Sequence, residues 1–184
     1  MPITKFKQKK LIEIISLGGV VAYPTESVFG LGCDPTNEFA VNKILKIKQR
    51  SPNKGLILIA SNITQLLPWI KIPDSKTWQK ICDTWPGPYN WVIEAQDGVP
   101  KIITGDHDTI AVRVSKHPTV QEICNSIGHP IVSTSANLSG KVALRNTIQV
   151  RKQLGKQLDY LVPGKCSRLK PCTIIDSRNM NILR

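Results

Sequence analysis

The chain has 184 residues, of which 41% are hydrophobic and 21% are charged, a composition typical of one folded domain spanning 1–184 and not of a disordered segment. Lys and Arg number 25 against 13 Asp and Glu, a net charge of +12, which suits a polyanionic partner such as a nucleoside triphosphate or RNA. No apolar run is long enough to cross a membrane, no signal peptide is recognisable, and the five cysteines form no CxxC pair. We therefore expect a cytoplasmic protein with reduced thiols, no membrane segment and no protein-bound metal.

Hydrophobic periodicity predicts helices that alternate with strands, the pattern of an α/β protein. We expect helices over residues 4–17, 38–50, 62–70, 75–84, 117–127 and 147–154. We expect strands over residues 20–24, 56–60, 89–95, 109–114, 160–162 and 173–176, with a further strand that starts at Pro130. Three of the segments beside these elements concentrate polar or cationic side chains.

The first such segment is the expected loop over residues 23–32, which begins where a buried strand ends. It carries the hydroxyl of Thr25 and the carboxylate of Glu26. Ligands commonly bind where the strands of an α/β sheet end, and Gly30 and Gly32 would let the backbone pass close to a ligand. The glycine spacing does not match a dinucleotide-binding fingerprint, so a tight turn capped by Thr25 is the alternative.

The second segment is the cationic stretch Lys46–Gly55. Lys48 continues the apolar face of the preceding helix, where a core residue would be expected, and Pro52 ends that helix. A continuous apolar run then predicts a buried strand, which places Lys48, Arg50 and Lys54 on one short turn. Cations held on a rigid turn favour an anion site. The alternative is that these side chains only interact with the helix dipole.

The strand over residues 109–114 places an arginine inside the sheet. Its residues alternate, so Thr109 and Arg113 share the wetter face. A buried arginine needs an anion or a carboxylate as partner, and its planar guanidinium suits the carboxylate of a ligand. The alternative is a structural ion pair with Asp106 or Asp108.

The third segment follows the strand that starts at Pro130, which delivers five uncharged polar residues to one loop: Ser133, Thr134, Ser135, Asn137 and Ser139. Hydroxyl and amide groups are donors for phosphate or carboxylate oxygens. The sequence contains no GxSxG motif, which argues against a nucleophilic serine, and no P-loop. The alternative is that these residues cap the following helix.

In this order, the segments resemble the motifs of the YrdC/TsaC family of threonylcarbamoyl-AMP synthases. The matching stretches are Tyr23–Glu26 with Gly30–Gly32, Lys48–Arg50 with Lys54–Gly55, Asp108–Arg113, and Ser133–Asn137 with Ser139–Gly140. Four spaced motifs in one order argue against a chance match. The resemblance extends from Val20 to Arg184, and the length is similar to that of the short bacterial form.

The resemblance implies a YrdC-like fold, an open, twisted mixed sheet with flanking helices around a basic concave cleft. It implies a nucleotidyltransferase that joins L-threonine, bicarbonate and ATP into threonylcarbamoyl-adenylate, with release of pyrophosphate and water. Mg²⁺ would accompany ATP, held mostly by phosphates and water. The product would pass to a separate threonylcarbamoyl transferase complex, which modifies the adenosine beside the anticodon of tRNA.

The resemblance also implies roles for individual residues. Lys48 and Arg50 are assigned to catalysis, as cations that stabilise the departing pyrophosphate. ATP binding is assigned to Lys48, Arg50, Lys54, Thr109, Ser135, Asn137 and Arg184. Threonine binding is assigned to Thr25, Arg113, Ser133 and Cys172. Cys172 stands where the family has a serine, and a thiol is the weaker hydrogen-bond partner.

A second hypothesis is a non-enzymatic RNA-binding protein that acts in tRNA or ribosome maturation. Residues 141–184 carry ten Lys and Arg against two Asp, and the segment 163–171 is expected to be an exposed loop. This hypothesis explains the basic last quarter of the chain and predicts tRNA or double-stranded RNA as a partner. It does not explain the uncharged loop after Pro130 or an arginine inside a strand.

Overall fold

A computed structural model describes residues 5–166 and 170–184. The helices are α1 (Lys5–Ser16), α2 (Glu38–Lys48), α3 (Ser75–Thr84), α4 (Lys101–Thr104), α5 (Pro118–Ile127) and α6 (Thr147–Leu154), with the short 3-10 turns η1 (Pro52–Lys54), η2 (Leu67–Trp69) and η3 (Gly155–Gln157). The strands are β1 (Val21–Pro24), β2 (Phe29–Gly32), β3 (Ile57–Ala60), β4 (Tyr89–Glu94), β5 (Thr109–Val114), β6 (Ile131–Ser135), β7 (Tyr160–Leu161) and β8 (Thr173–Asp176). The expected loop over 163–171 lies partly outside the described residues.

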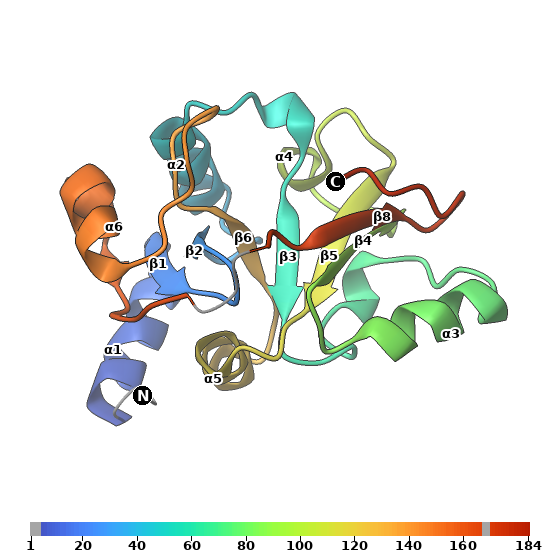
Figure 1. Ribbon diagram of the computed structural model, residues 1–184, viewed down its shortest axis with the longest axis horizontal. Helices are drawn as coiled ribbons and strands as arrows, with labels where there is room; N and C mark the ends of the chain where they lie inside the picture. The colour runs from blue at the N-terminus through green and yellow to red at the C-terminus, as the bar shows by residue number, and fades with distance from the viewer. Residues whose placement is uncertain (1–4, 167–169) are drawn as a thin grey trace.

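These strands form one mixed sheet of eight, in the order β7-β1-β2-β6-β3-β5-β4-β8 (Figure 1). The pairs β1–β7, β3–β5 and β4–β8 are parallel, and the remaining neighbours are antiparallel. β6 comes late in the chain but lies between β2 and β3, so it joins the two halves of the sheet. The expected fold class, a mixed sheet with flanking helices, is confirmed.

Alternate residues of the central strands enter two separate cores. Ile59 of β3 packs with Ile15 of α1 and Ile123 of α5, whereas Leu58 packs in the same cluster as Ile44 of α2. Neighbouring side chains of a strand point to opposite faces, so helices cover the sheet on both sides. Burial of each such side chain contributes about 1.5–3 kcal/mol.

The expected loop over residues 23–32 is only partly a loop, because Phe29–Gly32 forms β2, antiparallel to β1. Two glycines in four residues weaken the strand pattern. A Cβ on Gly30 would lie 3.0 Å from Cζ of Tyr23, and one on Gly32 would lie 2.8 Å from Cε1 of the same ring. The glycines therefore make room for the buried ring of Tyr23, a role that differs from the expected close approach to a ligand.

The helix expected over 62–70 is wrong, since only the turn η2 forms there. Pro68 has no N–H to donate within a helix, and the side chains of Gln65 and Asn62 accept hydrogen bonds from nearby backbone N–H groups instead. The four-residue α4 was not expected.

The helix expected to run to Arg50 ends earlier. α2 stops at Lys48, and Gln49 caps it in the left-handed conformation with φ 50°. Pro52 accordingly opens the turn η1 and does not end the helix itself. No helix in the described part of the chain is both long and apolar enough to cross a membrane.

Candidate active site

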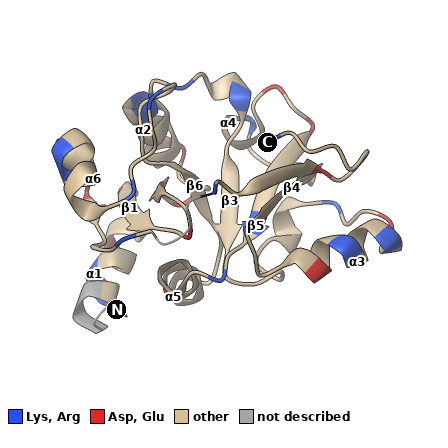
Figure 2. Cartoon of the chain, viewed as in Figure 1, with Lys and Arg blue, Asp and Glu red and all other residues tan. Residues whose placement is uncertain are grey.

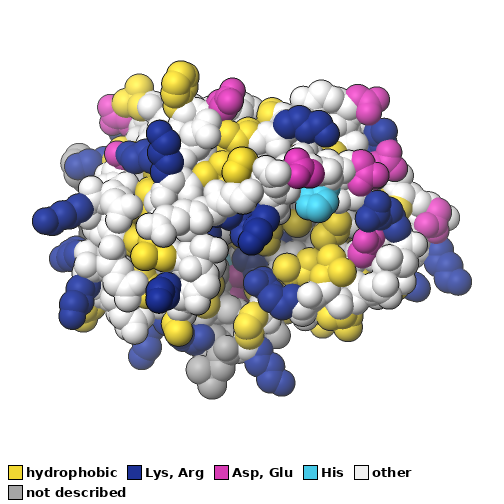
Figure 3. All heavy atoms as spheres, turned by 90° about the horizontal axis from the view of Figure 1, so that it is seen from above, with side chains coloured by type: hydrophobic (Ala, Val, Ile, Leu, Met, Phe, Trp, Pro, Cys, Tyr) yellow, Lys and Arg dark blue, Asp and Glu magenta, His cyan; other side chains and the backbone are white. Residues whose placement is uncertain are grey.

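An open cleft with a volume of about 780 Å³ lies over the central strands. Its floor follows one register line across five neighbouring strands, through Asp176, Val92, Ala111, Ile57 and Ser133. Seen from above, Lys and Arg side chains stand around a hollow with hydrophobic side chains beside it (Figure 3). The sheet itself thus carries side chains from β8, β4, β5, β3 and β6 into a single site.

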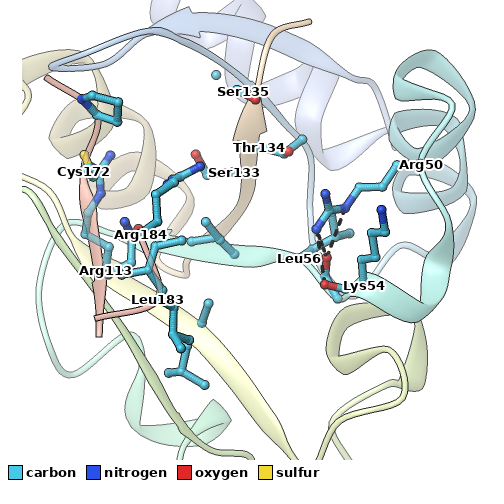
Figure 4. A pocket seen from close by; sticks show the side chains of 18 of the residues that line it. Arg50, Lys54, Leu56, Arg113, Ser133, Thr134, Ser135, Cys172, Leu183 and Arg184 are labelled. Atoms are coloured by element: carbon cyan, nitrogen blue, oxygen red, sulfur yellow. Dashed lines mark hydrogen bonds between the residues drawn. The ribbon is translucent and has the colours of Figure 1, made fainter. Parts of the chain in front are cut away.

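All residues assigned from the sequence line this cleft, namely Thr25, Lys48, Arg50, Lys54, Thr109, Arg113, Ser133, Ser135, Asn137, Cys172 and Arg184. In the close view, Arg113, Cys172 and Arg184 gather on one side, Arg50 and Lys54 face them from the other, and Ser133 to Ser135 lie between (Figure 4). The structure therefore brings the assigned residues together, while their individual roles remain predictions.

The described lining includes seven cationic residues and one carboxylate, Asp176. Lys141 and Arg178 join five cations that the sequence assigned: Lys48, Arg50, Lys54, Arg113 and Arg184. Arg178 pairs with Asp176, and Arg113 pairs with Glu26. These two ion pairs neutralise part of the positive charge. That the cleft is basic overall therefore stays a prediction.

Lys48 is 3% exposed, and its ammonium group binds the end of β6 and the loop that follows it. Nζ donates to the carbonyl oxygens of Ser135 and Asn137, the latter at 3.0 Å, and the Lys48 carbonyl accepts from the backbone N–H of Ser139 at 2.9 Å. Burial, with a smaller contribution from Arg50, lowers the pKa of Lys48 from 10.5 to about 8. Lys48 therefore holds the polar loop in place. Its contact with phosphate stays a prediction.

Arg50 closes the cationic turn upon itself. Its Nε and Nη2 donate to the carbonyl of Gly55 at 3.3 and 3.0 Å, and Nη2 also donates to the carbonyl of Lys54 at 3.2 Å (Figure 4). The turn rests on α4, since a Cβ on Gly55, whose φ is +59°, would lie 2.8 Å from the carbonyl oxygen of Thr104. Burial holds the pKa of Arg50 below its usual value. Arg50 and Lys54 thus stand on the turn after α2, as expected, whereas Lys48 is the last residue of that helix.

Arg113 is 5% exposed, and its partner is Glu26. Nη2 lies 3.2 Å from Oε2 of that carboxylate, and Nη1 lies 2.6 Å from Sγ of Cys172. The alternative pairing with Asp106 or Asp108 is wrong. A buried guanidinium with a carboxylate on one side and the cleft on the other is suited to a second, incoming anion.

Ser133 is oriented from below by a buried tyrosine. The Tyr23 hydroxyl donates to Oγ of Ser133 at 2.9 Å, and burial raises the pKa of Tyr23 far above its usual value, so this group stays a neutral donor. Ser133 to Ser135 belong to β6, which differs from the expected loop. Their polar side chains at the end of a buried strand therefore have a fixed direction.

Thr25 forms the tight turn that was named as its alternative, whereas the helix-capping alternative for the loop after β6 is wrong, because Asn146 is the N-cap of α6. Thr25 closes its turn through a hydrogen bond from Oγ1 to the carbonyl of Val28 at 2.6 Å. Asn137 donates from Nδ2 to the carbonyls of Leu138 and Lys141 at 2.8 and 2.6 Å, which shapes the loop after β6. Both residues also line the cleft, so turn formation and ligand contact are compatible.

Several lining residues were missed by sequence reasoning. Asn90 on β4 is buried and donates to the carbonyl of Thr173 at 3.2 Å. Asp176 on β8 holds Arg178, with Oδ2 3.1 Å from Nη2. A polar residue inside a buried strand was the available signal, and it was used for Arg113 but not for Asn90 or Asp176.

The fold and the site define a class: an α/β protein whose sheet forms the floor of a cleft, with an arginine paired to a carboxylate at one side and a cationic turn at the other. The family described as telomere recombination, which joins Sua5, YciO and YrdC, matches residues 13–184. The chain belongs to this family.

Relatives of similar length carry one name. The threonylcarbamoyl-AMP synthase of Vibrio vulnificus is 45% identical over 179 residues, which covers 96% of each chain. That of Nitrosococcus oceani is 45% identical over 172 residues and 93% of each chain.

Solved structures agree with the fold. P. abyssi Sua5, solved in complex with L-threonine, is 30% identical, with a TM-score of 0.93 over 100% of this chain. This chain spans 55% of that protein's length. E. coli YciO is 27% identical, with a TM-score of 0.83 over 92% of this chain and 82% of its own.

Proposed function

We propose that this protein is a threonylcarbamoyl-AMP synthase, which joins L-threonine, bicarbonate and ATP into threonylcarbamoyl-adenylate and releases pyrophosphate and water. Relatives that match nearly the whole chain bear this name, and a structural relative was solved with L-threonine. The product serves the threonylcarbamoyladenosine modification of tRNA.

One observation carries the assignment of the cleft: its floor runs without interruption from Ala111, on the strand of Arg113, to Ser133 on β6. A small zwitterion held at Arg113 would thus lie in the same hollow as a nucleotide held at the cationic turn (Figure 4). The reaction requires this proximity, because the amine of the amino acid gains a carboxyl group that must then reach the α-phosphorus of ATP. Holding both reactants in one orientation accelerates such steps.

At the amino-acid side, we assign the carboxylate of threonine to Arg113. Ser133, held by Tyr23, and Thr25 supply hydroxyls beside it, and Cys172 closes the wall. The amine attacks bicarbonate-derived carbon, a water is lost, and a carbamate oxygen becomes the nucleophile toward ATP. No group of the protein needs to form a covalent bond to a substrate in these reaction steps.

At the nucleotide side, we assign the phosphates to Lys54 and to the Nη1 edge of Arg50, whose Nε and Nη2 are used by the turn. Charge moves onto pyrophosphate as the α-phosphorus bond breaks, and fixed cations stabilise that change. Lys48 contributes its charge and holds Ser135 and Asn137 in place, while Thr109 and Arg184 line the remaining wall.

Arg50→Ala should weaken ATP binding by about 1–3 kcal/mol, measured by calorimetry. Unchanged affinity in a folded variant would refute the role.

Mg²⁺ is proposed to enter with ATP. Within the described residues, no three His, Cys, Asp or Glu side chains lie together so that they could hold a metal ion. Phosphate oxygens and water are the usual ligands of nucleotide-bound Mg²⁺, so this donor set fits an ion carried by the triphosphate. When bound, the ion neutralises phosphate charge.

RNA binding, the downstream transferase complex and a cytoplasmic location also remain proposals. The relatives are named as enzymes, which favours the enzymatic hypothesis over a non-enzymatic RNA-binding protein. RNA binding could still occur beside catalysis, because cations on α6, such as Arg151 and Lys152, are exposed.

The assay that tests the function measures adenylate formation with purified protein. Pyrophosphate release and a threonylcarbamoyl-adenylate product should require threonine, bicarbonate and ATP together. Serine and a reaction without amino acid are the comparisons. Absence of the adenylate when all three substrates are present would refute the enzyme.

A further inference from the structure

Glu26 lies in the turn between β1 and β2 and is 9% exposed. Its Oε2 stands 3.2 Å from Nη2 of Arg113, and its Oε1 accepts a hydrogen bond from Oγ of Ser115 at 2.7 Å. Ser115 directly follows β5, the strand that carries Arg113. One carboxylate therefore ties the turn between β1 and β2 to the end of this strand.

Glu26 does not border the cleft. Its neighbours Thr25 and Ser27 are among the described lining residues, and Glu26 is not. Arg113 does border it, and its Nη1 lies 2.6 Å from Cys172 on the cleft wall. The guanidinium is thus held from behind through Nη2 and presents its Nη1 edge to the cleft.

The carboxylate is built to stay charged and in place. Burial raises the pKa of Glu26, but the charge of Arg113 and the hydrogen bond from Ser115 outweigh burial and hold this pKa below its usual value. The Ser115 hydroxyl is itself fixed, because its oxygen accepts the backbone N–H of His117 at 3.0 Å.

Among the described residues, Oε2 of Glu26 has no hydrogen-bond partner, although it lies within ion-pair distance of Arg113. The pair is therefore held by charge more than by an aligned hydrogen bond. A buried arginine without its carboxylate would be an uncompensated charge, free to turn toward any anion.

We propose that Glu26 is a positioning residue for amino-acid recognition, which fixes the guanidinium of Arg113 so that a ligand carboxylate meets it in one orientation. This inference deepens the proposed function and rests on it, since it requires Arg113 to bind the carboxylate of threonine. Because Glu26 offsets the charge of Arg113, recognition depends on the direction of the Nη1 edge more than on net charge. The site therefore selects a ligand whose carboxylate meets this edge in one orientation.

The test is Glu26→Gln, which keeps the shape and removes the charge. We expect the KM for threonine to rise at least tenfold and the KM for ATP to change less than twofold, because the guanidinium loses its fixed direction and not its charge. Glu94→Gln is the matched control, because it makes the same change in an exposed ion pair with Lys71 outside the cleft. This control should leave both KM values unchanged.

Two further variants separate the possible failures. Ser115→Ala removes the donor to Glu26 but keeps both charges, and it should raise the KM for threonine about threefold; it decides the matter if Glu26→Gln does not fold. Arg113→Lys tests the underlying assignment: an unchanged threonine KM there would overturn the role of Arg113 and the inference with it. Two results would overturn the role of Glu26 and leave that of Arg113 intact. In both, Arg113→Lys raises the KM for threonine. Glu26→Gln then either lowers only the melting temperature or raises the KM values for threonine and ATP equally.

Discussion

Buried charged side chains of this protein are each held by groups that compensate them, and the chemistry of the cleft depends on this. Arg113 meets a carboxylate, and Lys48 meets the carbonyls of Ser135 and Asn137. Removing charge from water costs free energy unless such partners are supplied. Within the cleft, Arg113 and Lys48 are therefore cations whose direction the fold has already fixed.

Lys48 should make nucleotide binding sensitive to pH. Its pKa of about 8 in the folded protein lies below the ordinary 10.5, so its charge is lost as pH rises through about 8. We expect ATP affinity, measured without threonine, to fall between pH 7 and 9 in the native protein. The variant Lys48→Met should bind ATP weakly at both pH values, without this fall.

Folding stability should respond to the same group in the opposite sense. Between pH 8 and 10.5 the unfolded chain holds more protons at Lys48 than the folded chain does, so the contribution of this residue to stability rises with pH across that window. Urea denaturation of the native protein and of Lys48→Met should therefore differ in pH slope. Identical slopes would show that Lys48 keeps an ordinary pKa when folded.

Cys172 offers a direct test at the amino-acid side. Its thiol touches Nη1 of Arg113 and lies 4.0 Å from Oγ of Ser27, and a hydroxyl would be the stronger hydrogen-bonding group there. Cys172→Ser should lower the KM for threonine about two- to tenfold, in keeping with one improved hydrogen bond. Cys172→Ala should not lower it, and a fall in both variants would point to steric relief instead.

At the scale of elements, close contact between neighbouring segments fixes the site. Tyr23 of β1 lies against Gly32 of β2 and reaches Ser133 of β6 with its hydroxyl. In the same way, the cationic turn leans on α4, where a Cβ on Gly105 would lie 2.3 Å from the carbonyl oxygen of Asn53. Ser133 and the cationic turn are thus positioned by close packing between neighbouring segments of the chain.

Gly32→Ala should destabilise the protein by about 1–3 kcal/mol, because the new Cβ would lie 2.7 Å from the carbonyl oxygen of Val132 and 2.8 Å from the Tyr23 ring. Gly155→Ala is the matched control: its Cβ would find no atom closer than 3.5 Å, and its backbone is helical. Denaturant unfolding should show the control unchanged or slightly stabilised. Equal effects of the two substitutions would contradict the packing argument.

For the whole molecule, sequence periodicity predicted an α/β protein, while the mixed sheet and the assigned residues that meet in the cleft came from the resemblance to a known family. Neither the periodicity nor the resemblance revealed β2, because two glycines conceal a strand whose need for them comes from Tyr23 on another element. They also did not pair Arg113 with Glu26, which lies 87 residues away in the chain. Such a contact depends on the three-dimensional fold, because the residues around Arg113 and those around Glu26 do not indicate that the two side chains pair.

The uneven charge of the whole chain leads to a last prediction, about RNA. Residues 141–184 carry ten Lys and Arg against two Asp, and cations on α6 appear along one side of the molecule in Figure 2. Each cation that contacts phosphate adds about one unit to the salt dependence of binding.

The double variant Arg151→Gln with Lys152→Gln changes two exposed residues that do not line the cleft. It should weaken tRNA binding and lower its salt slope by about two, while adenylate synthesis stays unchanged. Filter binding across a salt series, beside the adenylate assay, separates the two surfaces. An unaltered salt slope would exclude α6 as an RNA contact, and a loss of adenylate synthesis would show that α6 supports the cleft instead.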